Sequence, residues 1–148
     1  MNKRMGAVMN SNFTDTSKRH IFIVGCKGIP TRYGGFETFV DKLTEYTKDE
    51  SIQYHVSRIL DDSEYNENNT EYEYNGAHCF DIKQRMGGPQ KAIFYDVDAI
   101  KYSIDYIKKY NLKEPVIYVL ACRIGPFIGK FKRQIHELCL LYTSDAAD

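Results

Sequence analysis

A glycine-rich loop near the N-terminus holds the residues of this sequence that best suit binding chemistry. The run Val24-Gly25-Cys26-Lys27-Gly28-Ile29-Pro30-Thr31-Arg32-Tyr33-Gly34-Gly35 ends where an amphipathic segment begins. If that segment is a helix, its first backbone N–H groups are free and lie at the positive end of the helix dipole. Glycine lets a phosphate oxygen approach such a backbone closely. Gly34 and Gly35 are therefore candidate phosphate ligands, and Lys27 and Arg32 can add positive charge.

The spacing within this loop differs from the common nucleotide-binding motifs. It matches neither G-x-G-x-x-G nor G-x-x-x-x-G-K-[ST], so a standard dinucleotide site or P-loop is disfavoured. The alternative to phosphate binding is that Gly34-Gly35 only forms a tight turn before the helix. Both interpretations stay open on spacing alone.

Hydrophobic periodicity predicts the elements that position this loop. Apolar, β-rich runs indicate strands, and apolar residues spaced three and four apart indicate helices. The expected strands are residues 20–25, 52–60, a pair within 71–83 that turns at Asn75-Gly76, and 115–121. Three helices are expected. The first covers residues 35–47 and the last covers residues 128–138. The middle one ends near Tyr110-Asn111 and has apolar residues spaced three and four apart, at Ile93, Val97, Ile100, Ile104 and Ile107. Residues 61–70 are acidic and rich in Asn, which predicts a surface loop.

Alternating strands and helices predict an α/β fold with a mainly parallel sheet flanked by helices. Glycine-bearing loops over 25–35, 85–89 and 122–127 each follow a strand and precede a helix. In sheets of this class, ligands bind beyond the carboxyl ends of the strands. The sequence therefore predicts one binding site at that edge, formed by the three loops.

Composition excludes several function classes. Lys and Arg total 20, as do Asp and Glu, and the zero net charge argues against a nucleic-acid partner bound through a strong basic field. No apolar run approaches the roughly 18 residues of a membrane span. The four cysteines contain no C-x-x-C pair, which disfavours a structural zinc site. No apolar segment follows Lys3 and Arg4 as in a secretory signal, so we expect a cytoplasmic location with free thiols.

The two ends of the sequence differ in character from the rest. Residues 1–19 are polar and without period, which predicts a disordered lead-in, and residues 20–138 form the expected domain. Residues 139–148 resemble the translated reading frame of a sequencing adapter. We therefore expect a non-native tail after Leu138 and an incomplete domain; the alternative is a genuine short C-terminal tail.

Three segments in the same order resemble one family of bacterial proteins. Residues 24–40, 91–96 and 118–127 are similar to the N-terminal region of glycosyltransferases that is called the rhamnosyltransferase N-terminal domain, formerly a domain of unknown function of the DUF1972 type. The resemblance extends over about residues 20–138. It implies a Rossmann-like N-terminal, acceptor-binding domain of a GT-B glycosyltransferase similar to the retaining family four, truncated before the donor-binding domain.

The resemblance also implies an activity. Such enzymes transfer a sugar, commonly rhamnose from dTDP-rhamnose, to a lipid-linked sugar at the inner membrane face during capsule or exopolysaccharide synthesis. No cofactor or metal is expected, and the implied partners are the nucleotide-sugar, the lipid-linked acceptor and the missing C-terminal donor domain. A peripheral contact with the membrane would involve Lys130, Lys132 and Arg133, whose alternative role is a solvated helix face.

The catalytic residues stay unknown because the donor-side groups are not in this sequence, and the chain alone is expected to be inactive. Residues implied in binding each keep a plain structural alternative. The implied donor-diphosphate ligands are Gly34 and Gly35; the implied substrate-binding residues are Lys27, Arg32, Tyr33, Glu37, Gly87, Gly88 and Arg123. Glu37 can instead be a first-turn carboxylate, and Arg123 can pair with an acidic neighbour. A competing function is a stand-alone phosphate- or nucleotide-binding regulatory module.

Overall fold

A mainly parallel sheet is the centre of the protein. The computed structural model describes residues 11–85, 87–121, 123, 129, 133 and 141–143. Within these residues the sheet has six strands in the order β3-β4-β2-β1-β5-β6, and only the β3–β4 pair is antiparallel. The strands are β1 (Arg19–Val24), β2 (Ile52–Leu60), β3 (Glu71–Tyr74), β4 (Ala77–Lys83), β5 (Val116–Val119) and β6 (Leu141–Thr143).

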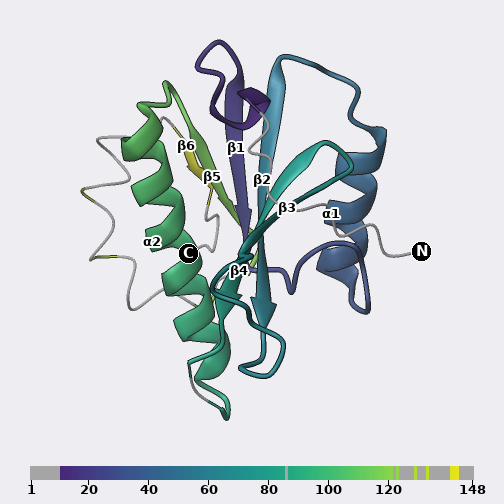
Figure 1. Ribbon diagram of the computed structural model, residues 1–148, viewed down its shortest axis with the longest axis vertical. Coiled ribbons are helices and arrows are strands. Elements are labelled where there is room, and N and C mark those ends of the chain that lie inside the picture. The colour runs from purple at the N-terminus through teal and green to yellow at the C-terminus, as the bar shows by residue number, and fades with distance from the viewer. Residues whose placement is uncertain are drawn as a thin grey trace.

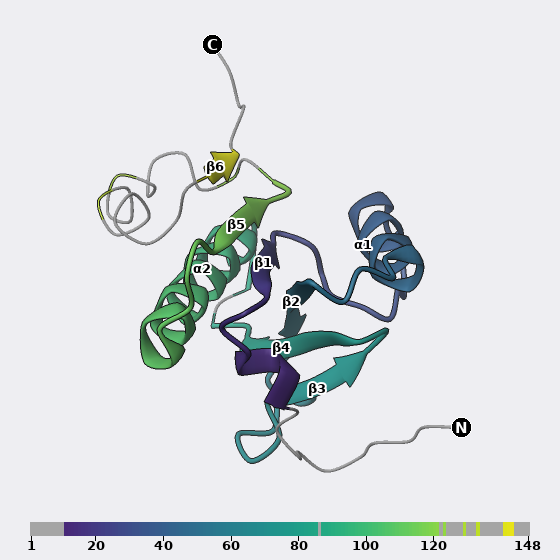
Figure 2. The same ribbon diagram turned by 90° about the horizontal axis from the view of Figure 1, so that it is seen from above.

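Two helices cover opposite faces of this sheet. Helix α1 (Gly35–Tyr46) connects β1 to β2, and helix α2 (Lys91–Tyr110) connects β4 to β5 (Figure 1). Seen from above, α1 and α2 lie on the two sides of the strands (Figure 2). The two connections run in opposite directions across the sheet, so right-handed crossovers place their helices on opposite faces. The predicted α/β, Rossmann-like class is confirmed.

Each face of the sheet has its own hydrophobic core. Successive residues of a strand point to opposite faces, so neighbours in β1 belong to different cores. Phe22 of β1 and Phe80 of β4 pack with the buried isoleucines of α2. Ile23 of β1 packs on the other face with Val40 of α1. Burial of these side chains is the main term that fixes both helices against the sheet.

The predicted elements agree closely with the observed ones. The predicted helix over 35–47 ends at Tyr46, and the helix predicted to end near Tyr110-Asn111 is α2. Residues 71–83 form the expected hairpin, in which Asn75 and Gly76 have φ angles of 51° and 75°. Two positive φ angles at these positions are the signature of a type I′ turn, for which Asn-Gly is the favoured pair.

The lead-in predicted over residues 1–19 is wrong for its second half. Residues 11–14 form a short 3-10 helix, and Phe13 is 5% exposed, with its ring centroid 5.0 Å from that of His78. The Tyr106 hydroxyl donates a hydrogen bond to the Phe13 carbonyl at 3.3 Å. This polar segment is held against the domain because the Phe13 ring packs on His78 and the Phe13 carbonyl accepts a hydrogen bond from Tyr106. Residues 1–10 lie outside the described residues.

The C-terminal predictions fall mostly on residues that the structure does not describe. The last helix predicted over 128–138, with Lys130 and Lys132, lies outside them apart from Gly129 and Arg133. Leu141–Thr143 pairs in parallel with β5 as an edge strand. The non-native origin of residues 139–148 stays a prediction. In the described part of the chain, no helix is long and apolar enough to cross a membrane.

Candidate functional site

The carboxyl ends of the parallel strands bring several loops to one edge of the sheet. β1, β2, β4 and β5 run in the same direction, so the segments that follow them start at the same edge, the lower one in Figure 1. These segments contain the glycine-rich loop 25–34, residues 84–85 and 87–90 before α2, and Arg123 after β5. The predicted gathering of these segments at one edge is therefore seen in the described residues.

The glycine-rich loop is fixed by hydrogen bonds from three directions. The Lys27 N–H donates to Glu37 Oε1 at 2.6 Å, and the Thr31 N–H and hydroxyl both donate to Asp41 Oδ2 at 2.8 Å. The Tyr72 hydroxyl, from β3, donates to the Ile29 carbonyl. The Tyr95 hydroxyl, from α2, donates to the carbonyl of Cys26. Side chains of α1, β3 and α2 therefore hold the backbone of the loop between Cys26 and Thr31.

Glu37 lies across the N-terminus of α1. Glu37 is buried, with 6% of the residue exposed, and a Cβ at Gly34 would collide with Glu37 Oε2. Gly34 also has a φ of 123°, a conformation that side chains disfavour. The first-turn carboxylate role is thus present in the structure, because Glu37 supplies negative charge at the positive helix end. Gly35 has nothing within 4 Å of the position of a Cβ, so the space on its side is open. The diphosphate role of Gly34 and Gly35 stays a prediction.

Three predicted binding residues project from this fixed loop. The Lys27 ammonium lies 5.6 Å from the ring centroid of Tyr33, and Tyr33 is 79% exposed. Arg32 is exposed as well, and its Nη1 lies 3.5 Å from Oε1 of the exposed Glu64. Such an exposed ion pair contributes little to stability. The loop therefore presents two cations and an aromatic ring to solvent.

Arg123 forms the acidic pair that its structural alternative requires. Its Nε lies 3.0 Å from Asp96 Oδ2, its Nη2 lies 3.2 Å from Asp96 Oδ1, and Nη2 also donates to the Gly25 carbonyl at 3.1 Å. Asp96 is fully buried, and burial raises the pKa of its carboxyl while Arg123 opposes the rise. The side chain of Arg123 is 42% exposed, so its outer edge is free to meet an anion.

Gly87 and Gly88 stand apart from these residues. Both are exposed, and neither has an atom within 4 Å of the position of a Cβ. Their neighbour Arg85 pairs with Asp98 of α2, with Nε 2.6 Å from Oδ2. The role of Gly87 and Gly88 at an acceptor cleft stays a prediction.

A comparison with known protein families identifies the family of this chain. Residues 18–145 match the model of a domain of unknown function, DUF1972. The chain belongs to the DUF1972 family. Domains of this family are found at the N-termini of glycosyltransferases. No curated protein and no solved structure matches the chain.

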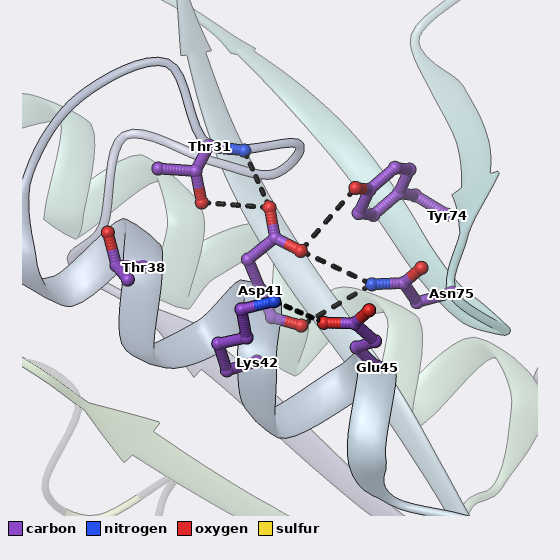
Figure 3. A pocket seen from close by; sticks show the side chains of 7 residues that line it. All are labelled: Thr31, Thr38, Asp41, Lys42, Glu45, Tyr74 and Asn75. Atoms are coloured by element: carbon purple, nitrogen blue, oxygen red, sulfur yellow. Dashed lines mark hydrogen bonds and ion pairs between the residues drawn. The ribbon is translucent and has the colours of Figure 1, made fainter.

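The DUF1972 domain also contains a polar pocket that the sequence did not reveal. It lies between α1 and the β3–β4 hairpin, has a volume of about 290 Å³ and is lined by Thr31, Thr38, Asp41, Lys42, Glu45, Tyr74 and Asn75 (Figure 3). Hydrogen bonds from Thr31, Tyr74 and Asn75 outweigh burial and lower the pKa of Asp41. The pocket escaped prediction because the hairpin turn and α1 are distant in sequence and meet only in the fold.

Two further groups in the DUF1972 domain support the loop without being exposed to a ligand. Arg58 of β2 lies beneath Gly28 and pairs with Asp81 through contacts of 2.6 Å and 2.8 Å. Cys26 is buried, and burial raises the pKa of its thiol to about 11, so it is a neutral thiol and a poor nucleophile at pH 7. Among the described residues, no group of three or more His, Cys, Asp or Glu is arranged to hold a metal ion.

Asp96, Asp41 and Asp81 are the site-supporting residues that sequence reasoning missed. For Asp96 a signal existed, because it falls on the buried stripe of α2 between apolar positions. A carboxylate at such a position requires a hydrogen-bonded cation, and Arg123 was the candidate at the same edge of the sheet.

Proposed function

We propose that this DUF1972 domain is the acceptor-binding half of a GT-B, family-four-like glycosyltransferase. In this proposal the enzyme is a rhamnosyltransferase that moves rhamnose from dTDP-rhamnose to a lipid-linked glycan in capsule or exopolysaccharide synthesis. Its place is the cytoplasm, with a peripheral contact to the inner membrane face, and it uses no cofactor or metal. The family's occurrence at the N-termini of glycosyltransferases and the Rossmann-like sheet support the proposal.

The observation that carries this function is the fixed loop 25–34 with its exposed cations and ring. A lipid-linked sugar acceptor presents a diphosphate beside a sugar ring. Lys27 and Arg32 match the negative charge of the diphosphate, and the exposed face of Tyr33 matches the apolar face of a sugar. Because the loop backbone is already fixed, little conformational entropy is lost when a ligand binds.

The donor diphosphate has a separate place in the proposal. The open side of Gly35 at the N-terminus of α1 offers backbone N–H groups, and the outer edge of Arg123 offers a second positive group. Glu37 already supplies one negative charge at this helix end, so the donor would bind beside its carboxylate and not in place of it. Most of the remaining donor contacts belong to the second domain of the enzyme.

Replacing Lys27 and Arg32 together by Ala is expected to weaken binding of a short-chain prenyl-diphosphate-linked sugar by about tenfold for each cation removed, because each can make a charge-assisted hydrogen bond. Calorimetric titration of the 148-residue chain measures this. The matched control is Lys108→Ala with Lys109→Ala, which removes the same charge at the opposite end of α2. An equal loss in both double variants would contradict the proposal, and tight binding of free dTDP without acceptor binding would favour the regulatory module instead.

The 148-residue chain alone is expected to transfer no sugar. In the proposed architecture the donor domain provides most of the groups that bind and activate the nucleotide-sugar, and this chain provides the acceptor side. The measurement is a transfer assay with dTDP-rhamnose and the prenyl-linked acceptor. Turnover by the isolated chain, scaling with its concentration, would show that the half-enzyme assignment is wrong.

A further inference from the structure

Three of the four histidines of this protein form one buried row across the sheet. His20 of β1, His55 of β2 and His78 of β4 lie on neighbouring strands, and all three are fully buried. His20 Nδ1 lies 2.8 Å from His55 Nε2, and His55 Nδ1 lies 2.8 Å from His78 Nδ1. We call these three residues the histidine row. Each of its two internal contacts is a hydrogen bond that holds one proton between two ring nitrogens.

Both ends of the histidine row meet groups that only accept hydrogen bonds. His20 Nε2 lies 2.8 Å from the Asp15 carbonyl oxygen. His78 Nε2 lies 3.6 Å from Glu71 Oε2 and is the one buried side-chain nitrogen or oxygen of the described residues without a hydrogen-bond partner. The other oxygen of Glu71 accepts a hydrogen bond from the Tyr102 hydroxyl. A carbonyl at one end and a carboxylate at the other both require an N–H.

Counting protons along the row leads to a conflict if all three rings are neutral. With Glu71 ionised, three hydrogen bonds and the 3.6 Å approach of His78 Nε2 to the carboxylate call for four N–H groups, but three neutral imidazoles carry only three. If His20 satisfies Asp15, then His78 turns a bare lone pair toward the Glu71 carboxylate. If His78 donates to Glu71, then His20 turns a lone pair toward the Asp15 carbonyl at 2.8 Å. Either arrangement turns the lone pair of a buried ring nitrogen toward an acceptor, which is costly.

We propose that the histidine row is a binding site for one additional proton, so that its three rings together carry four N–H groups and a single positive charge paired with Glu71. The fourth proton satisfies both terminal acceptors at once. The site then ties the Asp15 carbonyl, before β1, to the edge strand β3 through a continuous row of hydrogen bonds. This inference does not depend on the glycosyltransferase proposal, because the row lies under α2 and away from the loop 25–34.

Burial disfavours positive charge on the row, and the Glu71 carboxylate opposes this at one end of it. Burial, and then the neighbouring His78 and His20, lower the pKa of His55 well below its usual value, and burial lowers that of His20. His78 lowers the pKa of Glu71, burial opposes this, and Tyr102 adds to the lowering, so the carboxylate is the counter-ion. The charged or titratable groups around the row are Asp15 and Lys18 before β1, Glu71 and Glu73 on β3, and Tyr102, Tyr106, Lys109 and Tyr110 on α2.

Aromatic rings enclose the row and leave it little contact with solvent. The Phe22 ring stacks on His55 at 4.2 Å, and the Tyr106 ring lies 5.2 Å from His55 and 5.1 Å from His78. Phe13 covers His78 from the N-terminal segment. A positive charge enclosed in this way is stable only beside its carboxylate, and the faces of the aromatic rings favour it further.

Nitrogen NMR of the folded protein tests the proton count. The protein is labelled with ¹⁵N in its histidines, and His136→Gln removes the only histidine outside the row. At pH 7 we expect protonated fractions that sum to four over the six ring nitrogens, however the protons exchange along the row. A sum of three would overturn the proposal, and the wild-type count decides this without any variant in the row.

Glu71→Gln provides the matched variant. The amide can accept from Tyr102 with its oxygen and donate with its nitrogen to an unprotonated His78 Nε2, so the added proton is no longer needed. The proton sum should fall from four to three in Glu71→Gln and stay at four in Glu45→Gln, a control that removes an exposed carboxylate from α1, on the other side of the sheet. Equal sums in all three proteins would contradict the assignment.

Unfolding experiments measure the same proton independently. Wild-type and Glu71→Gln proteins have the same histidines in the unfolded state and the same two buried cysteines, Cys26 and Cys79. The contributions of these groups to the pH dependence of unfolding therefore cancel when the two proteins are compared. Only the folded wild type carries the added proton and releases it on unfolding. From pH 7 to pH 8, the ratio of the two unfolding equilibrium constants, wild type over variant, should therefore rise about tenfold. A ratio that does not change with pH would overturn the proposal.

Discussion

Replacing Gly28 by Ala is expected to destabilise the folded protein by about 3 kcal/mol or more. Gly28 has a φ of 114°, a backbone conformation that an L side chain adopts only with strain. A Cβ there would also lie 3.0 Å from the Arg58 Cα, and closer still to Arg58 Cβ and Cγ. The Cα belongs to β2, which is paired on both sides, so it cannot move without disturbing the sheet. Urea unfolding followed by circular dichroism measures the loss.

Gly35→Ala is the matched control for this substitution. Gly35 is the first residue of α1 and has nothing within 4 Å of a Cβ position. Alanine loses less backbone entropy than glycine in a helix, so we expect unchanged stability or a gain of up to about 1 kcal/mol. If Gly28→Ala and Gly35→Ala lower the unfolding free energy equally, the close contact between Gly28 and Arg58 does not explain the effect of Gly28→Ala.

The contrast between these two glycines shows what the sequence can and cannot reveal. Both lie in the same glycine-rich run, and sequence reasoning assigned the binding role to Gly34 and Gly35 because they precede a helix. Helix and strand positions follow from hydrophobic spacing, a local property, and the Asn75-Gly76 turn follows from local backbone chemistry. The close approach of Gly28 to Arg58 depends on the crossing of a loop over β2, which no local pattern encodes.

Glu37 shows the same limit within the candidate site. Its place in the first helical turn was evident from the sequence, and both a structural and a binding role fitted that place. The structure adds a hydrogen bond from the Lys27 N–H to Glu37, which the sequence does not reveal and which joins the two ends of the loop. The histidine row is a stronger case, since its three residues lie on different strands and meet only through the parallel register of β1, β2 and β4.

Asp81→Ala is expected to destabilise the protein by about 2–3 kcal/mol. The Asp81 side chain is 4% exposed and accepts two hydrogen bonds from Arg58, at 2.6 Å and 2.8 Å. Arg58 stays largely enclosed after the substitution, with its guanidinium 4.2 Å from the Tyr72 ring and its stem under Gly28. Removing the carboxylate therefore leaves a partly buried cation without its counter-ion. Because the Arg58 side chain is 27% exposed, the loss of unfolding free energy should be smaller than for a fully buried pair.

Asp62→Ala separates this effect from the loss of any surface ion pair. Asp62 pairs with Lys83 at 2.7 Å, but its side chain is 80% exposed, so water replaces the lost partner and the change in unfolding free energy should stay below about 1 kcal/mol. The effect of the unpaired charge is tested further by adding Arg58→Met to Asp81→Ala, which removes both charges. If the double variant is more stable than Asp81→Ala, the unpaired Arg58 accounts for the loss; if it is equally unstable, the lost packing under the glycine-rich loop does.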